Sequence, residues 1–161
     1  GGVIPKEFIK PTTDGLMEAC NNGVVAGYPV VDVKMTITDG SFHPVDSSEI
    51  AFKIAASMAF KDACQKSGMK ILEPVMKMEI VTPEEHMADV IGDVSSRRGN
   101  VMEVVTKDDM ANISAQVPLA ELFGYATAIR SLTKGRASAT MEPSHFQPVP
   151  DHVQKELLEK K

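Results

Sequence analysis

The stretch VMKMEIVTP, residues 75–83, opens a pattern that the chain uses twice. Its first seven residues are typical of a strand, and its proline suits the first turn of a helix. The second copy is ANISAQVP, residues 111–118. Each copy continues into an amphipathic helical segment that ends at a basic run with glycine, RRG at 97–99 and KGR at 134–136. This repeat decides the fold that we expect for the second half of the chain.

A further strand follows each predicted helix, over residues 101–106 and 137–142. The order strand–helix–strand, used twice, predicts a ferredoxin-like split βαβ domain, that is, βαββαβ. We place it at residues 71–161, with a C-terminal helix at about 150–160. The apolar stripes of the two repeat helices consist of Met87, Val90, Ile91 and Val94, and of Leu122, Tyr125, Ala126 and Ile129.

Residues 1–70 form the other predicted domain. Residues 11–22 have the apolar spacing of a helix, with Leu16, Met17 and Cys20 on one face. Residues 31–38 alternate apolar and polar side chains without a fault, which predicts a strand with one face in water.

A second helix is predicted after a short loop at residues 39–46. Asp46 is the expected N-cap, with Glu49 reaching back to complete a capping box. Apolar residues spaced four apart follow, flanked by alanines, and we expect this stripe to pack closely against a sheet face. The stripe consists of Ile50, Ile54 and Met58. The whole chain is therefore predicted to be α+β, with two α/β-sandwich domains.

Composition and motifs exclude several classes of function. The chain is 43% hydrophobic without tryptophan and carries a net charge of −5, so any nucleic acid contact must use local basic clusters. Cys20 and Cys64 are expected to be reduced thiols in a cytoplasmic protein. We find no run of about 18 apolar residues that would predict a membrane span. Phosphate-loop, dinucleotide-binding, zinc-protease and nucleophile-elbow motifs are all absent, so no catalytic, cofactor or metal site is expected.

Six stretches, in order, resemble bacterial elongation factor G. They are GGVIPKEF at 1–8, AGYPVVDV at 26–33, DGSFHPVDSSEIAFKIAASMAFK at 39–61, LEPVMKMEIVTPEE at 72–85, DVIGDVSSRRG at 89–99 and VPLAELFGYATAIRSLTKGRAS at 117–138. The resemblance implies that residues 1–70 are the later part of domain IV, with a ribosomal-protein-like left-handed βαβ crossover, and that residues 71–161 are domain V. It also implies that the early strands of domain IV lie upstream of Gly1, as does a GTPase domain that binds GTP and Mg²⁺.

The resemblance implies two sites on the ribosome. The domain IV tip loop is expected to enter the small-subunit decoding centre and contact the tRNA–mRNA duplex; its residues are Gly40, Ser41, Phe42, His43, Pro44 and Asp46. Domain V is expected to face the rRNA and stalk base of the large subunit. The basic residues that close the two repeat helices are Arg97, Arg98, Arg130, Lys134 and Arg136. We expect the repeat to bring them to one edge as a phosphate-binding patch, or to use them only as cations at helix C-termini.

Two departures from the family pattern concern the tip loop. Phe42 stands where tyrosine is commonest, and Pro44 where an acidic residue is frequent.

The function that the resemblance implies is promotion of tRNA and mRNA translocation by a monomeric fragment that is not itself an enzyme. The alternatives are a ribosomal protection or recycling paralogue of the same family, or a stand-alone ferredoxin-like binding module.

Overall fold

A computed structural model describes residues 3–159 of the protein. The chain divides into two compact units. Unit 1 comprises the residues up to Ile71 together with those from Pro150 onward, and unit 2 comprises Leu72–Val149. The C-terminal helix that we predicted as part of the second domain thus lies in unit 1.

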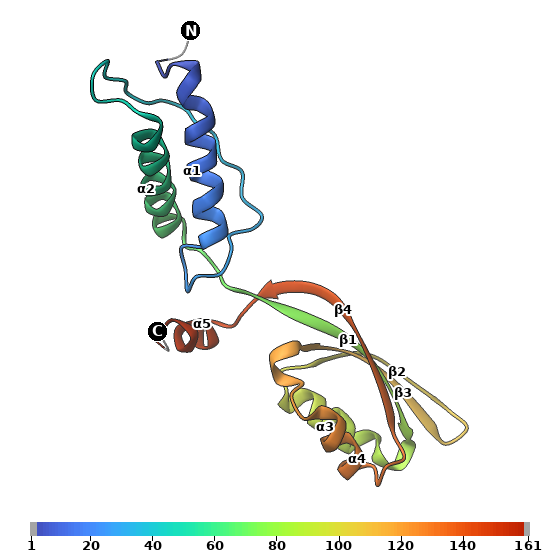
Figure 1. Ribbon diagram of the computed structural model, residues 1–161. Coiled ribbons are helices and arrows are strands. Elements are labelled where there is room, and N and C mark those ends of the chain that lie inside the picture. Colours follow the sequence, from blue (N-terminus) through green and yellow to red (C-terminus); the bar gives the residue numbers. More distant parts are fainter. Residues whose placement is uncertain (1–2, 160–161) are drawn as a thin grey trace. The chain divides into compact units, whose positions relative to one another are not determined.

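Unit 2 has the predicted ferredoxin-like plan. Its four strands form one antiparallel sheet in the order β2-β3-β1-β4, and helices α3 and α4 lie together against it (Figure 1). Strand β1 is central because it pairs with both β3 and β4. The elements are β1 (Leu72–Pro83), η2 (Glu84–His86), α3 (Met87–Ser96), β2 (Asn100–Lys107), β3 (Met110–Pro118), η3 (Leu119–Glu121), α4 (Tyr125–Leu132) and β4 (Ser138–Pro148).

The core of unit 2 lies between the sheet and the two helices. Met78, Ile80 and Ile113 point from β1 and β3 into this layer and are fully buried. The predicted stripe of α3 is correct, since Val90 and Val94 are buried with Met87 and Ile91 packed against them. In the second stripe, Ala126 is exposed and that assignment was wrong. The helical path is interrupted at Gly124, whose φ of 71° lies in the left-handed region, and α4 begins only at Tyr125.

Unit 1 is built on two packed helices, α1 (Ile9–Asn22), preceded by the short η1 (Lys6–Phe8), and α2 (Glu49–Ser67). The helices approach closely at Gly15, where an added Cβ would lie 2.3 Å from the Lys53 carbonyl oxygen. Their shared core consists of Ala19, Cys20, Phe60 and Cys64. Helix α5 (Asp151–Glu159) completes unit 1.

The strand predicted at residues 31–38 is not formed. This segment has no ladder partner, and Val31, Val33 and Ile37 are 61%, 45% and 42% exposed. A strand exists only through hydrogen bonds to a neighbouring strand. Between residues 3 and 71 the structure contains no other strand, so the alternating pattern has nothing to pair with.

Two predictions about α2 were also wrong. Ser48, in an extended conformation, is the N-cap: its hydroxyl accepts a hydrogen bond from the Ala51 N–H at 3.1 Å, and Asp46 lies in the preceding turn. The stripe of Ile50, Ile54 and Met58 is 54–71% exposed. The neighbour of α2 is α1, which it meets through the face that carries Phe60 and Cys64, and no sheet covers the stripe in the described part of unit 1.

Candidate functional site

The loop predicted as the tip lies between the extended segment and α2, at one end of unit 1. Residues 41–46 are all exposed, with Pro44–Asp46 forming a turn. Two hydrogen bonds close the loop: the His43 N–H donates to the Ser47 hydroxyl at 2.9 Å, and the Ser47 N–H donates to the His43 carbonyl at 3.1 Å. The loop therefore has a defined shape, although it lacks regular secondary structure.

The His43 ring faces two groups of its own loop. Its Nδ1 lies 3.4 Å from the Val45 nitrogen and 3.2 Å from a carboxylate oxygen of Asp46. A neutral ring can accept the Val45 N–H at Nδ1, whereas a protonated ring donates from Nδ1 to Asp46. In both states Nε2 stays available to a partner, because the side chain is 64% exposed.

Phe42 anchors the base of the loop. Its ring lies 5.8 Å from that of Phe8, which is buried and stacks in turn on Phe52 at 4.5 Å with only 7° between the ring planes. Gly40 lies against Ile4, because a Cβ at Gly40 would come within 2.5 Å of the Ile4 side chain. The supporting roles of Phe8 and Phe52 were missed by sequence analysis, since no local spacing links them to Phe42.

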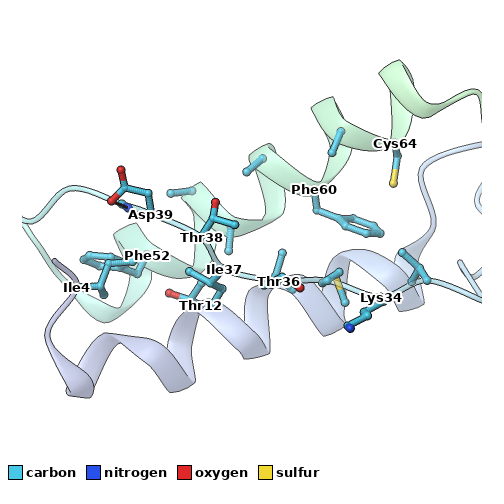
Figure 2. A pocket seen from close by; sticks show the side chains of 18 of the residues that line it. Ile4, Thr12, Lys34, Thr36, Ile37, Thr38, Asp39, Phe52, Phe60 and Cys64 are labelled. Atoms are coloured by element: carbon cyan, nitrogen blue, oxygen red, sulfur yellow. Dashed lines mark hydrogen bonds between the residues drawn. The ribbon is translucent and has the colours of Figure 1, made fainter. Parts of the chain in front are cut away.

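An apolar groove of about 560 Å³ runs behind the loop. It is bounded by α1, α2 and the segment 33–40, and Figure 2 shows Phe60 and Cys64 directed toward it from α2. Burial raises the pKa of both Cys20 and Cys64, which lowers their thiolate fraction and their reactivity. Within residues 3–159, no group of three or more His, Cys, Asp or Glu side chains could hold a metal ion.

The five basic residues of unit 2 do not share one edge, and that prediction was wrong. Arg97 and Arg98, at the end of α3, reach Glu121 at the start of the second helical segment. Arg136, beyond the end of α4, reaches Glu85 and His86 at the start of α3. Because the two helices run in opposite directions, the repeat places its basic ends at opposite ends of the helix pair.

Three of the five cations are already paired. Arg97 lies 2.9 Å from Asp93 and 5.2 Å from the centre of the Tyr125 ring. Arg98 makes a two-point contact with Glu73 at 2.7 and 3.0 Å, and the hydrogen bond from Arg136 lowers the pKa of Glu85. Arg130 and Lys134 are exposed, and no ion pair engages either of them within residues 3–159.

The aromatic ring under Arg97 is itself unusual. Tyr125 is 2% exposed, and its hydroxyl has no hydrogen-bond partner among the described residues. Burial, with a contribution from Asp93, raises the pKa of Tyr125 to about 12. The hydroxyl thus stays protonated, and the residue acts as a packing and cation–π partner.

Comparison with known proteins connects these two units to one family. The model of "Elongation factor G, domain IV" matches residues 1–68, and the model of "Elongation factor G C-terminus" matches residues 70–157. The chain belongs to the elongation factor G family. It is 54% identical over 160 residues to elongation factor G of Chlamydia trachomatis serovar D, and equally to that of serovar A.

A solved structure also resembles the chain. A crystal structure from Thermus thermophilus matches 99% of this chain and 24% of its own, with a TM-score of 0.83 and 38% identity. The alignment with the Chlamydia factor likewise covers 99% of this chain but 23% of the relative's length. The chain thus corresponds to the domain IV and C-terminal parts of elongation factor G, and it spans about a quarter of the length of the relatives that it matches. The same matches favour this family over an unrelated ferredoxin-like binding module.

No helix between residues 3 and 159 is long and apolar enough to cross a membrane.

Proposed function

We propose that residues 1–161 are the ribosome-contacting part of the factor and promote the movement of tRNA and mRNA. The observation that carries this proposal is the presence of both family parts, in order, over almost the whole chain. The role is mechanical, because the energy comes from GTP hydrolysis with Mg²⁺ in another domain of the same polypeptide. This part holds no cofactor and acts as a monomer in the cytoplasm, continuous with the upstream domains.

The tip loop is the part that we assign to the decoding centre of the small subunit. A duplex of codon and anticodon presents a wide, shallow minor groove with 2′-hydroxyls and phosphates. The exposure of residues 41–46 makes the loop accessible to such a groove. Its closure by His43 and Ser47 supports the proposal further, because a loop that is already ordered loses little entropy on binding.

His43 is the residue that we expect to contact RNA most directly. In the complete factor, His43→Ala should slow single-round translocation by about tenfold, the effect of losing one hydrogen bond of about 1.4 kcal/mol in the transition state. GTP hydrolysis on the ribosome should stay nearly unchanged, because the GTPase domain is separate. The matched control is His145→Ala, which removes an exposed histidine of β4 outside the loop. Equal translocation rates for the two variants would remove His43 from the site.

Unit 2 is the part that we assign to the rRNA and stalk base of the large subunit. Of the five basic candidates, Arg130 and Lys134 are best suited to bind phosphate. Arg97, Arg98 and Arg136 already have carboxylate partners that RNA would have to displace. We therefore expect Arg130 and Lys134 to contribute most to the interaction with the large subunit.

A second candidate function rests on the tip sequence. Phe42 lacks the phenolic hydroxyl expected at its position, and Pro44 lacks the acidic group. A ribosomal protection or recycling factor of the same family differs from a translocase mainly in this loop. The translocation assay separates the two, because a specialised paralogue would not restore translocation to ribosomes that lack their own factor.

A further inference from the structure

Helix α5 is tied to the segment Met69–Ile71, the last residues of unit 1 before the chain enters β1. One side chain makes two of the contacts. The Gln154 Oε1 accepts the N–H of Ile71 at 3.1 Å, and its Nε2 donates to the carbonyl of Met69 at 3.3 Å. A primary amide presents one acceptor and one donor, as a backbone peptide does. Gln154 thus satisfies the backbone groups of the residues before and after Lys70, the Met69 carbonyl and the Ile71 N–H, as a neighbouring strand would.

The rest of the attachment of α5 is weak. None of the residues Asp151–Glu159 is buried. The remaining side-chain bond to the segment joins Lys70 to Asp151 at 2.7 Å, with the two side chains 52% and 89% exposed. The hydrogen bond to Lys70 lowers the pKa of Asp151, yet an ion pair this exposed contributes little to stability. Elements with few buried contacts open at a small cost in free energy.

We propose that α5 is a releasable strap, and that Gln154 is the residue that latches it to Met69–Ile71. In the attached state the backbone of the segment is fixed at two points. In the released state the Ile71 N–H and the Met69 carbonyl bind water, and the segment gains conformational freedom. Attachment or release of α5 therefore sets the flexibility of the segment Met69–Ile71, where the chain leaves unit 1. This inference is independent of the RNA contacts assigned above.

Hydrogen exchange of the Ile71 amide in residues 1–161 tests the latch. Gln154→Ala should accelerate this exchange about tenfold, because removing a net hydrogen bond of this kind shifts a local opening equilibrium by that factor. The matched control is Glu156→Ala, an exposed truncation on the same helix. It should leave the Ile71 rate unchanged.

Two further measurements separate the latch from a general loss of structure. Gln154→Glu keeps the acceptor for Ile71 but removes the donor to Met69, so it should retain most of the protection. The amide of Phe60, inside α2, reports unfolding of unit 1 as a whole and should be unaffected in every variant. The proposal is overturned if Ile71 exchanges at the original rate in Gln154→Ala, if Glu156→Ala has the same effect, or if Phe60 accelerates together with Ile71.

Discussion

Arg98 joins three segments of unit 2 through a single side chain. Its guanidinium holds both carboxylate oxygens of Glu73, which precedes the central part of β1, and one oxygen of Glu121 in η3. The hydrogen bonds that Arg98 donates, those to Glu73 foremost, raise the pKa of Arg98. Glu73 is only 6% exposed, and Arg98 is the ion-pair partner of its buried carboxylate. Arg98, which sequence analysis considered both for phosphate binding and as a helix-terminal cation, thus forms ion pairs within unit 2.

Arg98→Met should destabilise unit 2 by about 3 kcal/mol, because it leaves the buried carboxylate of Glu73 without its partner. Methionine is unbranched, as arginine is, so the positive φ of 56° at this position affects both residues alike. Urea unfolding of the chain measures the decrease in stability.

Arg130→Met is the matched control, since it removes an exposed arginine from α4. Its effect should stay within about 0.5 kcal/mol. The double variant Arg98→Met with Glu73→Gln should recover part of the stability, because the buried charge is then removed as well. A destabilisation of similar size for the two arginines would contradict the assigned role of Arg98.

At the level of elements, the packing of α1 on α2 depends on a missing side chain. Replacing a helical glycine by alanine favours the helix by about 1 kcal/mol when nothing else changes. At Gly15 the new Cβ would meet the backbone of Lys53 at 2.3 to 3.0 Å, so one helix must move away from the other. The clash outweighs the gain, because backbone atoms cannot turn aside as a flexible side chain can.

Gly15→Ala should therefore destabilise unit 1, whereas Gly92→Ala should stabilise unit 2. Gly92 lies inside α3, and a Cβ there would meet nothing within 4 Å. The same substitution should thus lower the stability at one helical position and raise it at the other. Thermal unfolding of each variant measures both changes. Stabilisation by Gly15→Ala would mean that α1 and α2 do not pack as closely as described.

The elements that sequence predicted correctly are those whose partners lie within the chain. Each strand of the repeat pairs with another strand of the same unit, so the pattern at 75–83 and 111–118 suffices to specify the sheet. The equally regular pattern at 31–38 does not suffice, because alternation describes one strand and a ladder needs two. Periodicity likewise identifies α2 as a helix, but it does not say which of two apolar faces, that of Ile54 or that of Phe60, meets α1.

The candidate sites divide in the same way. The position of the tip loop follows from its place between the alternating segment at 31–38 and a helix start. The pairing of Arg98 with Glu73 does not, because 25 residues separate them and only the folded sheet brings them together. A basic run at a helix end therefore indicates where cations lie, not whether they are free.

For the whole molecule, the question is whether overall charge or local placement governs binding to RNA. The net charge of −5 repels an RNA surface. If local contacts dominate, reversing Arg130 and Lys134 to glutamate in the complete factor should weaken ribosome binding. The slope of log K against log salt should fall by about 0.7–0.9 for each phosphate that the variant no longer neutralises.

Reversing Lys61 and Lys155 is the matched control, because both are exposed lysines in unit 1 and the change in net charge is identical. A field that acts from the molecule as a whole would lower the affinity of both double variants alike, and their salt slopes would agree. If Arg130 and Lys134 contact RNA directly, the two double variants should differ. Only the reversal of Arg130 and Lys134 should then give a smaller salt slope. Filter binding to ribosomes over a range of salt concentrations decides between the two cases, and equal slopes would return Arg130 and Lys134 to the role of helix-terminal cations.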